Sequence, residues 1–190
     1  IWDPYLLHLV DASARWKPGA YARRGDTLAQ VVRLDILAQA GKPDLARMNQ
    51  LRPANLRDLE RWILAAAYVS AGRSDAGQEL ASKAGTSVSD ARSLGEWLWS
   101  DVRDRAMMLE AMVRVGEQEK SLELFKSLRA TVRDGNMWLS TQEGGTALWS
   151  FASWLDKRGS GPAFEGQWRV GGGAWKNVSG SKGTVLVELP

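Results

Sequence analysis

The residues of this chain whose types and spacing could support catalysis are carboxylates that lie close together. Asp101, Asp104 and Glu110 lie close together in the sequence, and two carboxylic acids facing one cleft, about 5 or about 6.5–9.5 Å apart, would serve glycoside hydrolysis. Asp101 and Asp104, however, stand at the start of a predicted helix, where acidic side chains complement the helix dipole. We therefore interpret them as structural, and Arg103 and Arg105 as local or interhelical ion-pair partners.

Three other features that often mark a functional site point away from one here. His8 is the only histidine, so a histidine-rich metal site is excluded within this chain. Cysteine is absent, which excludes disulfides, thiolate catalysis and cysteine-based zinc sites. The glycines at 171–173 lie between two predicted strands and lack a following Gly-Lys-Ser/Thr, so they do not form a phosphate loop. We expect no catalytic residue, no cofactor and no metal ion.

Residues 100–132 predict two amphipathic helices with identifiable ends. The first begins near Ser100 or Asp101 and ends at Gly116, because apolar residues recur with helical spacing between them. The second extends over 117–132 and is followed by the helix-breaking Gly135 and Asn136. The expected buried residues are Val102, Ala106, Leu109, Met112 and Val113 in the first helix, and Leu122, Phe125, Leu128 and Val132 in the second.

A third helix begins with a capping box. In Ser140-Thr141-Gln142-Glu143, the Ser140 hydroxyl can accept the backbone N–H of Glu143, whose carboxylate reaches back toward Ser140. We expect this helix to continue to Leu155. Its predicted buried side consists of Ala147, Leu148, Phe151, Trp154 and Leu155.

The first half of the chain predicts further helices built on the same pattern. They cover 3–16, a segment capped by Asp26 or Thr27 and ending at Gly41, a short helix with Pro43 in its first turn, 56–71 and 74–84. Residues 17–24 read as a loop, and 86–99 as a looser piece with one or two turns.

Three junctions between these helices look alike, at Gly41, Gly72 and Gly116. Each consists of a helix, a glycine at the position after its end, and a polar start to the next helix. The repeating unit is therefore a helical hairpin used at least three times. Its irregular spacing argues against a strict tetratricopeptide array, which repeats every 34 residues or so. Two architectures of stacked hairpins stay open: a solenoid, or a ring in which the hairpins close on themselves.

The sequence changes character after Leu155. Residues 158–162 form a Gly/Ser/Pro linker, and 164–170 alternate apolar and polar residues as a strand does. The glycines at 171–173 would turn the chain so that 175–178 pair back, and 184–189 predict a further strand. We expect a mainly α protein with a short C-terminal β segment: a helical domain at 1–157, a linker at 158–162, and strands of a following β-domain at 163–190.

Composition limits the function classes further. The formal net charge is only +3, and basic residues are interspersed with acidic ones, which gives no support for nucleic-acid binding. No apolar run approaches the ~18 residues needed to span a bilayer, so we expect no membrane insertion. Ten tryptophans, spread from Trp2 to Trp175, fit a large helical core. The start at Ile1 is neither a methionine nor a signal sequence, which suggests a fragment of a longer protein.

Residues 100–110 and 138–149 resemble the end of the helical domain of bacterial alpha-2-macroglobulins. The matching residues are Asp101, Arg103, Asp104, Trp138, Ser140, Thr141, Gln142 and Glu143. The resemblance implies the later part of an α/α-toroid, the thioester-type domain of that family, followed by β-strands. The family's Cys-x-Glu-Gln thioester motif is missing from this chain, so no covalent chemistry is assigned to it. Gly144 and Gly145 also depart from the family pattern, and we interpret them as allowing close helix approach.

This resemblance implies a non-catalytic piece of a broad-spectrum protease inhibitor. In such a trap, cleavage of a bait region elsewhere changes the conformation and encloses the protease. The implied location is the periplasm, with a lipid anchor on the parent protein as one option. The implied partners are target proteases, the other domains of the same protein and a cell-wall synthase. Two alternatives stay open: a tetratricopeptide-like module that binds a peptide in a groove, and a toroid glycosidase with two facing carboxylates in an aromatic-lined cleft.

Overall fold

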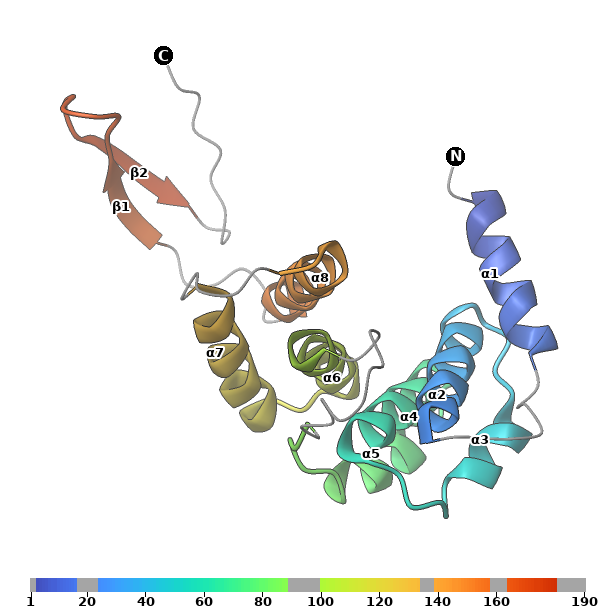
Figure 1. Cartoon of the computed structure of the whole chain (residues 1–190). Coiled ribbons are helices and arrows are strands. Elements are labelled where there is room, and N and C mark those ends of the chain that lie inside the picture. The colour runs from blue at the N-terminus through green and yellow to red at the C-terminus, as the bar shows by residue number, and fades with distance from the viewer. Residues whose placement is uncertain (1–2, 17–23, 89–99, 134–138, 158–163, 181–190) are drawn as a thin grey trace.

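A computed structural model describes residues 3–16, 24–88, 100–133, 139–157 and 164–180 (Figure 1). Its helices in the first half are α1 Asp3–Arg15, α2 Arg24–Gln39, α3 Leu45–Leu51, α4 Asp58–Ser70 and α5 Ser74–Ser82. The second half holds α6 Asp101–Val115, α7 Glu119–Arg133, α8 Thr141–Lys157, β1 Phe164–Trp168 and β2 Lys176–Gly180. The predicted mainly α fold with a short C-terminal β segment is confirmed.

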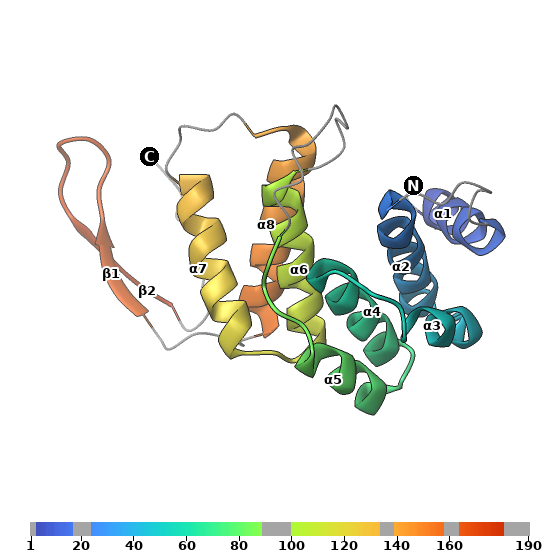
Figure 2. The same ribbon diagram turned by 60° about the horizontal axis from the view of Figure 1, so that its bottom comes forward.

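The even-numbered helices form one continuous layer. α2 packs on α4, α4 on α6 and α6 on α8, while α3, α5 and α7 contact α2, α4 and α6 respectively. Figure 1 shows this layer as an arc with α3, α5 and α7 on its outer side. Figure 2 shows that α2, α4, α6 and α8 run in the same direction, since each odd-numbered helix brings the chain back. The architecture is therefore two curved helical layers built from antiparallel hairpins.

The three glycine junctions have the same geometry. Gly41, Gly72 and Gly116 adopt φ values of 72°, 73° and 87°, a left-handed conformation that glycine accepts without steric cost. In each case the next residue donates its N–H to a carbonyl five positions back, as in Lys42 to Leu37 at 2.9 Å. This is a Schellman motif, which satisfies the last carbonyls of a helix. The repeated hairpin predicted from the sequence is confirmed at all three positions.

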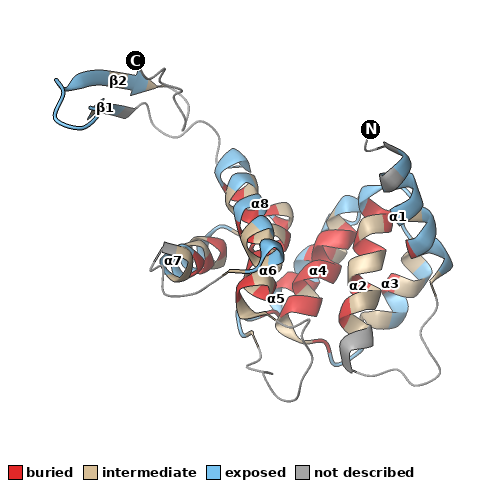
Figure 3. Cartoon of the chain, turned by 45° about the horizontal axis from the view of Figure 1, so that its top comes forward, coloured by how far each residue is buried: buried red, intermediate tan, exposed pale blue. Residues whose placement is uncertain are grey.

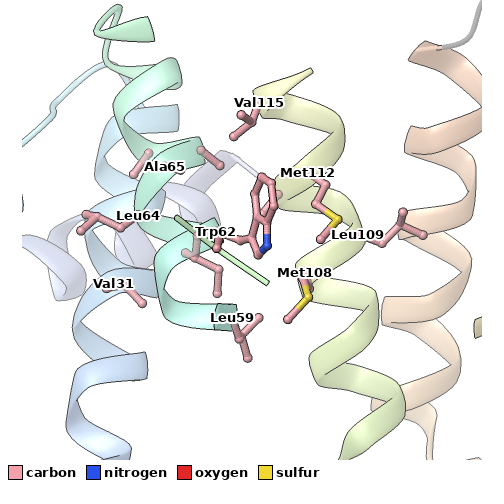
Figure 4. Close-up of a cluster of buried hydrophobic side chains, with 14 of the residues drawn as sticks. Val31, Leu59, Trp62, Leu64, Ala65, Met108, Leu109, Met112 and Val115 are labelled. Carbon is pink, nitrogen blue, oxygen red and sulfur yellow. The ribbon is translucent and has the colours of Figure 1, made fainter. Parts of the chain in front are cut away.

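The core lies between the helices of the continuous layer. Figure 3 shows the buried residues concentrated on α4 and on the facing sides of its neighbours. Trp62 of α4 is fully buried and lies against Met108 and Met112 of α6 (Figure 4). Its indole Nε1–H donates to the Gly85 carbonyl at 2.8 Å, so the polar edge of the ring is satisfied. The tryptophan thus joins α4, α6 and the chain that leaves α5.

Several helix starts differ from the predicted ones. α2 begins at Arg24, before the expected caps Asp26 and Thr27. α3 begins at Leu45, with Asp44 as its N-cap accepting the Arg47 N–H at 3.1 Å, so Pro43 lies outside the helix. α7 begins at Glu119 because the Glu117 carboxylate accepts the N–H groups of residues 119 and 120. In α3 and α7 a capping carboxylate therefore lies before the first helical residue, whereas in α2 both expected caps lie inside the helix.

The predicted inward faces are confirmed for α6 and only in part for α7 and α8. All five residues expected for α6 are buried. In α8, Ala147 and Trp154 are buried as expected, but Leu148 and Leu155 are 68% and 56% exposed, so their prediction is wrong. α8 is apolar around most of its circumference, and helical periodicity alone does not select the side that packs on α6.

The two described strands confirm the predicted hairpin. β1 and β2 are antiparallel, with Phe164 opposite Gly180 and Trp168 opposite Lys176. Gly171, in the connecting turn, has a φ of 55°. The predicted strand at 184–189, the turns at 89–99 and the linker at 158–162 lie outside the described residues. The domain boundaries therefore stay a prediction.

The interpretation of Gly144 and Gly145 as points of close helix approach is wrong. A Cβ added at either position meets nothing within 4 Å. The close approach occurs instead at Gly77 of α5, where a Cβ would lie 2.8 Å from the carbonyl oxygen of Ala65 in α4 and 2.8 Å from a methyl group of Val69. α4 and α5 can thus pack tightly because residue 77 has no side chain.

These three glycines give a matched pair of predictions. Gly77→Ala is expected to lower the free energy of unfolding by about 1–2 kcal/mol, because overpacking outweighs the gain in helix propensity. Gly145→Ala is expected to raise it by up to about 1 kcal/mol, since the helix gains propensity without a clash. Urea unfolding followed by circular dichroism measures both. A Gly77→Ala protein as stable as Gly145→Ala would contradict the packing described for α4 and α5.

Candidate functional site

The residues that the sequence singled out gather where α6 and α8 begin. Ser100 is the N-cap of α6, and its Oγ accepts the backbone N–H of Arg103 at 3.3 Å. Ser140 has the same role for α8, where its Oγ accepts the N–H of Glu143 at 3.2 Å. The Glu143 carboxylate accepts the N–H of Ser140 at 2.7 Å in return. The capping box predicted at residues 140–143 is confirmed.

Glu143 also connects the two helix ends. The Ser100 hydroxyl donates to Oε1 of Glu143, so one carboxylate caps its own helix and holds the cap residue of α6. The hydrogen bonds from Ser100 and Ser140 lower the pKa of Glu143 below its ordinary value. This arrangement fixes the start of α8 against the start of α6 through a residue that is ionised at neutral pH.

Asp101 and Asp104 each pair with an arginine. Oδ1 of Asp104 accepts from Nη2 of Arg103 at 2.8 Å and from Nε at 3.2 Å. Oδ1 of Asp101 accepts from Nε of Arg105 at 3.0 Å, and Arg105 also donates to the Ser127 hydroxyl of α7 at 3.2 Å. Burial raises the pKa of Asp104, although Arg103 opposes the shift. The predicted local ion pairs around 101–105 are present, and Arg105 contacts the neighbouring helix α7 through a hydrogen bond to a hydroxyl group and not through an ion pair.

A pH-dependent loss of stability follows from the lowered pKa of Glu143. The stabilisation is fully present above the unfolded-state pKa, near 4.5, and is lost as the pH falls through the lower folded-state pKa. Glu143→Gln is expected to cost about 1 kcal/mol at pH 7, the usual size of a cap contact, and less below pH 4 or so.

Measuring urea unfolding of both proteins from pH 3 to pH 7 tests this, and the difference between them isolates Glu143 from the other acids. Glu119→Gln, in the first turn of α7, is the control. A difference between the Glu143→Gln and parent proteins that does not change with pH would contradict the assignment.

A second polar cluster, which sequence reasoning missed, joins three helices of the layer. Arg114 of α6 donates from Nη1 and Nη2 to the two carboxylate oxygens of Asp35 in α2, at 2.7 Å each. Its Nη1 also donates to the Ser70 hydroxyl of α4 at 3.2 Å, and its Nε lies 2.8 Å from Glu110. Gln39 donates to Asp35 at 2.9 Å. Arg114 of α6 therefore reaches past α4 and binds α2, the next helix of the layer beyond α4.

Burial and neighbouring charges both shift the pKa values of the ionisable groups in this cluster. Burial disfavours the charge of Arg114, but the hydrogen bonds and charges of Asp35 and Glu110 outweigh that effect, so the pKa of Arg114 lies above its ordinary value. Burial raises the pKa of Glu110, against the opposing effect of Arg114. A sequence signal existed, because Asp35 and Arg114 each interrupt an apolar run. Charged residues inside such runs are seldom buried unless they are paired.

The remaining chemical candidates are placed apart from these clusters. His8 lies exposed on α1, and the glycines at 171–173 connect β1 to β2. Within the described ranges, no group of three or more histidine, cysteine, aspartate or glutamate residues could hold a metal ion. Among the same residues, no helix is both long and apolar enough to cross a membrane. Trp138, Thr141 and Gln142 complete the predicted set; Trp138 lies outside the described residues, and the other two are exposed in α8.

The chain is similar to solved structures of two bacterial proteins. A crystal structure of a mutant of Salmonella alpha-2-macroglobulin matches 94% of this chain with a TM-score of 0.64 and 22% identity. A cryo-EM reconstruction of the native conformation of E. coli alpha-2-macroglobulin matches 94% with a TM-score of 0.62 and 20% identity. The chain spans only 12% and 11% of those proteins.

Comparisons based on sequence add no further relatives. No family model matches the chain, and the search of curated proteins gives no significant match. The structural matches agree with the resemblance that residues 100–110 and 138–149 carry, and they extend it to nearly the whole chain. This protein has the fold of a segment of the bacterial alpha-2-macroglobulins.

Proposed function

We propose that the chain forms an arc of an α/α-toroid in an alpha-2-macroglobulin-like protease trap and acts there as a non-catalytic structural part. The observation that carries the proposal is the curved double layer of hairpins, in a chain of which 94% is covered by each of the two structural matches. The layer formed by α2, α4, α6 and α8 is curved, and this curvature supports a ring that closes on itself over a straight solenoid (Figure 1). The carboxylates Asp101 and Asp104 are engaged by arginines, which favours a structural role over glycoside hydrolysis.

Both ends of the arc expose large apolar side chains. On α8 these are Leu148, Trp149 and Leu155, with Trp149 67% exposed. On α1 they are Leu6, Leu7 and Leu9, and Figure 1 places α1 and α8 at opposite ends of the arc. Clusters of exposed apolar residues mark surfaces that bury against a partner. In the proposed trap, the partner at each edge is a further hairpin of the same toroid.

The trap would act on proteases in the periplasm. The partners in this proposal are the enclosed proteases and the other domains of the same protein, and a cell-wall synthase stays a prediction from the resemblance. No thiolate is available in this chain, so its contribution would be shape and docking. Because the chain spans about an eighth of the matched proteins, the inhibitory activity belongs to the whole protein.

The decisive experiment uses the complete product of the gene that encodes this chain. The product is incubated with trypsin, and cleavage of a small chromogenic peptide and of casein is measured. Enclosure predicts that the peptide is still cleaved while casein is protected. Protection of neither substrate, or inhibition of both, would contradict the trap.

A variant at the exposed edge tests the role of this arc within the trap. Trp149→Arg in the complete protein is expected to reduce casein protection, because a charge then faces the neighbouring hairpin. In the 190-residue chain alone it is expected to leave the melting temperature unchanged, since Trp149 is exposed there. Glu123→Arg, on the exposed side of α7, is the matched control. Unchanged protection by the Trp149→Arg protein would exclude the α8 edge as an interface.

A further inference from the structure

The hairpin formed by β1 and β2 projects from one end of the helical arc. Figures 1 and 3 show that the turn between its strands is the part of the hairpin farthest from the helices. The Gly173 N–H donates to the Val170 carbonyl at 3.0 Å, and Gly171 supplies a left-handed φ of 55°, so the turn is tight. Val170 and Trp175, which flank this turn, are 53% and 57% exposed. The hairpin therefore presents apolar side chains at its tip.

Each of the two tryptophans next to the turn lies beside a cation. Lys176 is the direct cross-strand partner of Trp168, and its Nζ lies 5.2 Å from the centroid of the Trp168 ring. One residue nearer the turn on each side, the guanidinium carbon of Arg169 lies 4.5 Å from the centroid of the Trp175 ring. Since successive side chains of an extended chain point to opposite faces, the two pairs are expected on opposite faces of the hairpin.

The tip of the hairpin is electropositive. Residues 166–180 contain two cations, Arg169 and Lys176, and no acidic residue. The acid of the hairpin is Glu165, which lies near the base of β1 opposite Ser179. The ion pairs among the described residues all lie between residues 35 and 114, so no described acid forms an ion pair with either cation. The tip thus combines two positive charges with two tryptophans.

This combination limits the kind of partner. A rigid ligand with one binding surface would contact one face of the hairpin, and hence one of the two cation–tryptophan pairs. A fluid anionic lipid surface surrounds the tip and can contact both pairs at once. Tryptophan is favoured at the headgroup level of a bilayer because its ring is apolar and its N–H is polar, and lysine and arginine are attracted to anionic lipids. The exposed backbone of the glycines at 171–173 favours that level over the hydrocarbon core, which would leave its polar groups unsatisfied.

We propose that the tip of this hairpin adsorbs to an anionic lipid surface. Trp168 and Trp175 lie at the headgroup level, and Arg169 and Lys176 lie beside lipid phosphate groups. The contact is adsorption at the surface, and no segment of the chain crosses the bilayer in it. The inference stands on the hairpin alone and does not depend on the protease-trap proposal.

Flotation of the 190-residue chain with lipid vesicles tests the proposal. The vesicles consist of phosphatidylcholine alone or of an equimolar mixture of phosphatidylcholine and phosphatidylglycerol, and the fraction of protein that floats with them gives the apparent affinity. Binding to the mixed vesicles is expected to be at least about tenfold tighter, because each of the two cations contributes about fivefold. High salt should remove most of this difference, since it screens exposed charges.

Variants at the tip and two matched controls locate the contact. Trp175→Ala is expected to weaken binding to the mixed vesicles about tenfold, and Arg169→Gln combined with Lys176→Gln to remove the preference for anionic lipid. Trp149→Ala, exposed on α8, and Arg129→Gln, exposed on α7, should bind as the parent does. No binding to the mixed vesicles, equal binding to both kinds of vesicle, or an equal loss in Trp149→Ala and Trp175→Ala would overturn the proposal.

Dextran sulfate separates a lipid surface from a soluble polyanion. It supplies negative charge without an apolar interface, so the variant with Arg169→Gln and Lys176→Gln should lose affinity for it, whereas Trp175→Ala should bind it nearly as the parent does. A loss of dextran sulfate binding by Trp175→Ala as large as its loss of vesicle binding would overturn the assignment to a lipid surface and make a soluble polyanion the partner.

Discussion

Replacing Arg114 by alanine is expected to lower the free energy of unfolding by about 2–4 kcal/mol, because it leaves a buried carboxylate without its partner. The Asp35 side chain is only 10% exposed and receives both Arg114 hydrogen bonds at 2.7 Å. Glu110 and Ser70 lose the same partner. The loss should be large because Arg114 is the point where α2, α4 and α6 meet.

Urea unfolding measures this effect, and two further variants interpret it. Arg114→Lys keeps the charge but cannot bind Asp35 in a bidentate manner, so an intermediate loss is expected. Arg129→Ala, exposed on α7, should change stability by less than about 0.5 kcal/mol. A double-mutant cycle with Asp35→Asn should show that the two effects are not additive. Additive effects would mean that the pair does not couple the helices.

Trp62→Ala is expected to be about as disruptive, with a loss of about 3–5 kcal/mol typical of an aromatic side chain removed from a packed core. Trp62 is fully buried between α4 and α6. Its removal also leaves the Gly85 carbonyl without the indole N–H and Lys120 without the ring that lies 5.6 Å from its Nζ. The loss of stability should be large because the Trp62 side chain contacts α6, the chain that follows α5 and Lys120 of α7.

The same substitution at the exposed Trp149 gives the matched control. Trp149→Ala in the isolated chain should alter the free energy of unfolding by less than about 0.5 kcal/mol. Chemical denaturation of both proteins, followed by circular dichroism, compares them directly. A similar loss at the two positions would mean that α8 is packed on the side that contains Trp149, contrary to the exposure described for it.

Local signals were the ones that could be predicted from sequence. Ser140 and Glu143 are three residues apart, and the bonds of their capping box involve only those residues and their own backbone. The glycines at 41, 72 and 116 end helices for an equally local reason, since their left-handed φ angles suit no other residue as well. These elements depend on neighbours in the chain, so a single sequence contains the necessary information.

Tertiary contacts were harder to predict. Asp35 and Arg114 form an ion pair although they are far apart in sequence, and the residues next to each of them do not indicate which residue it will pair with. Leu148 and Leu155 fit a buried face by periodicity, yet α8 packs on α6 through its other side. Gly77 and Gly145 are both glycines within helices, and only the position of α4 makes the first of them essential. These outcomes depend on how the helices meet, which helical periodicity does not specify.

The three glycines that end helices, Gly41, Gly72 and Gly116, also determine where this molecule can accept additional residues. They shorten the connections at 40–44, 71–73 and 116–118, where the hydrogen bonds that end one helix lie next to the start of the following helix. An insertion there would separate the glycine from the carbonyls that it caps. The fully described connection at the opposite ends of the helices, 52–57, carries no such motif. Tags, probes or new binding loops therefore belong on that side of the arc, where they leave the hairpins intact.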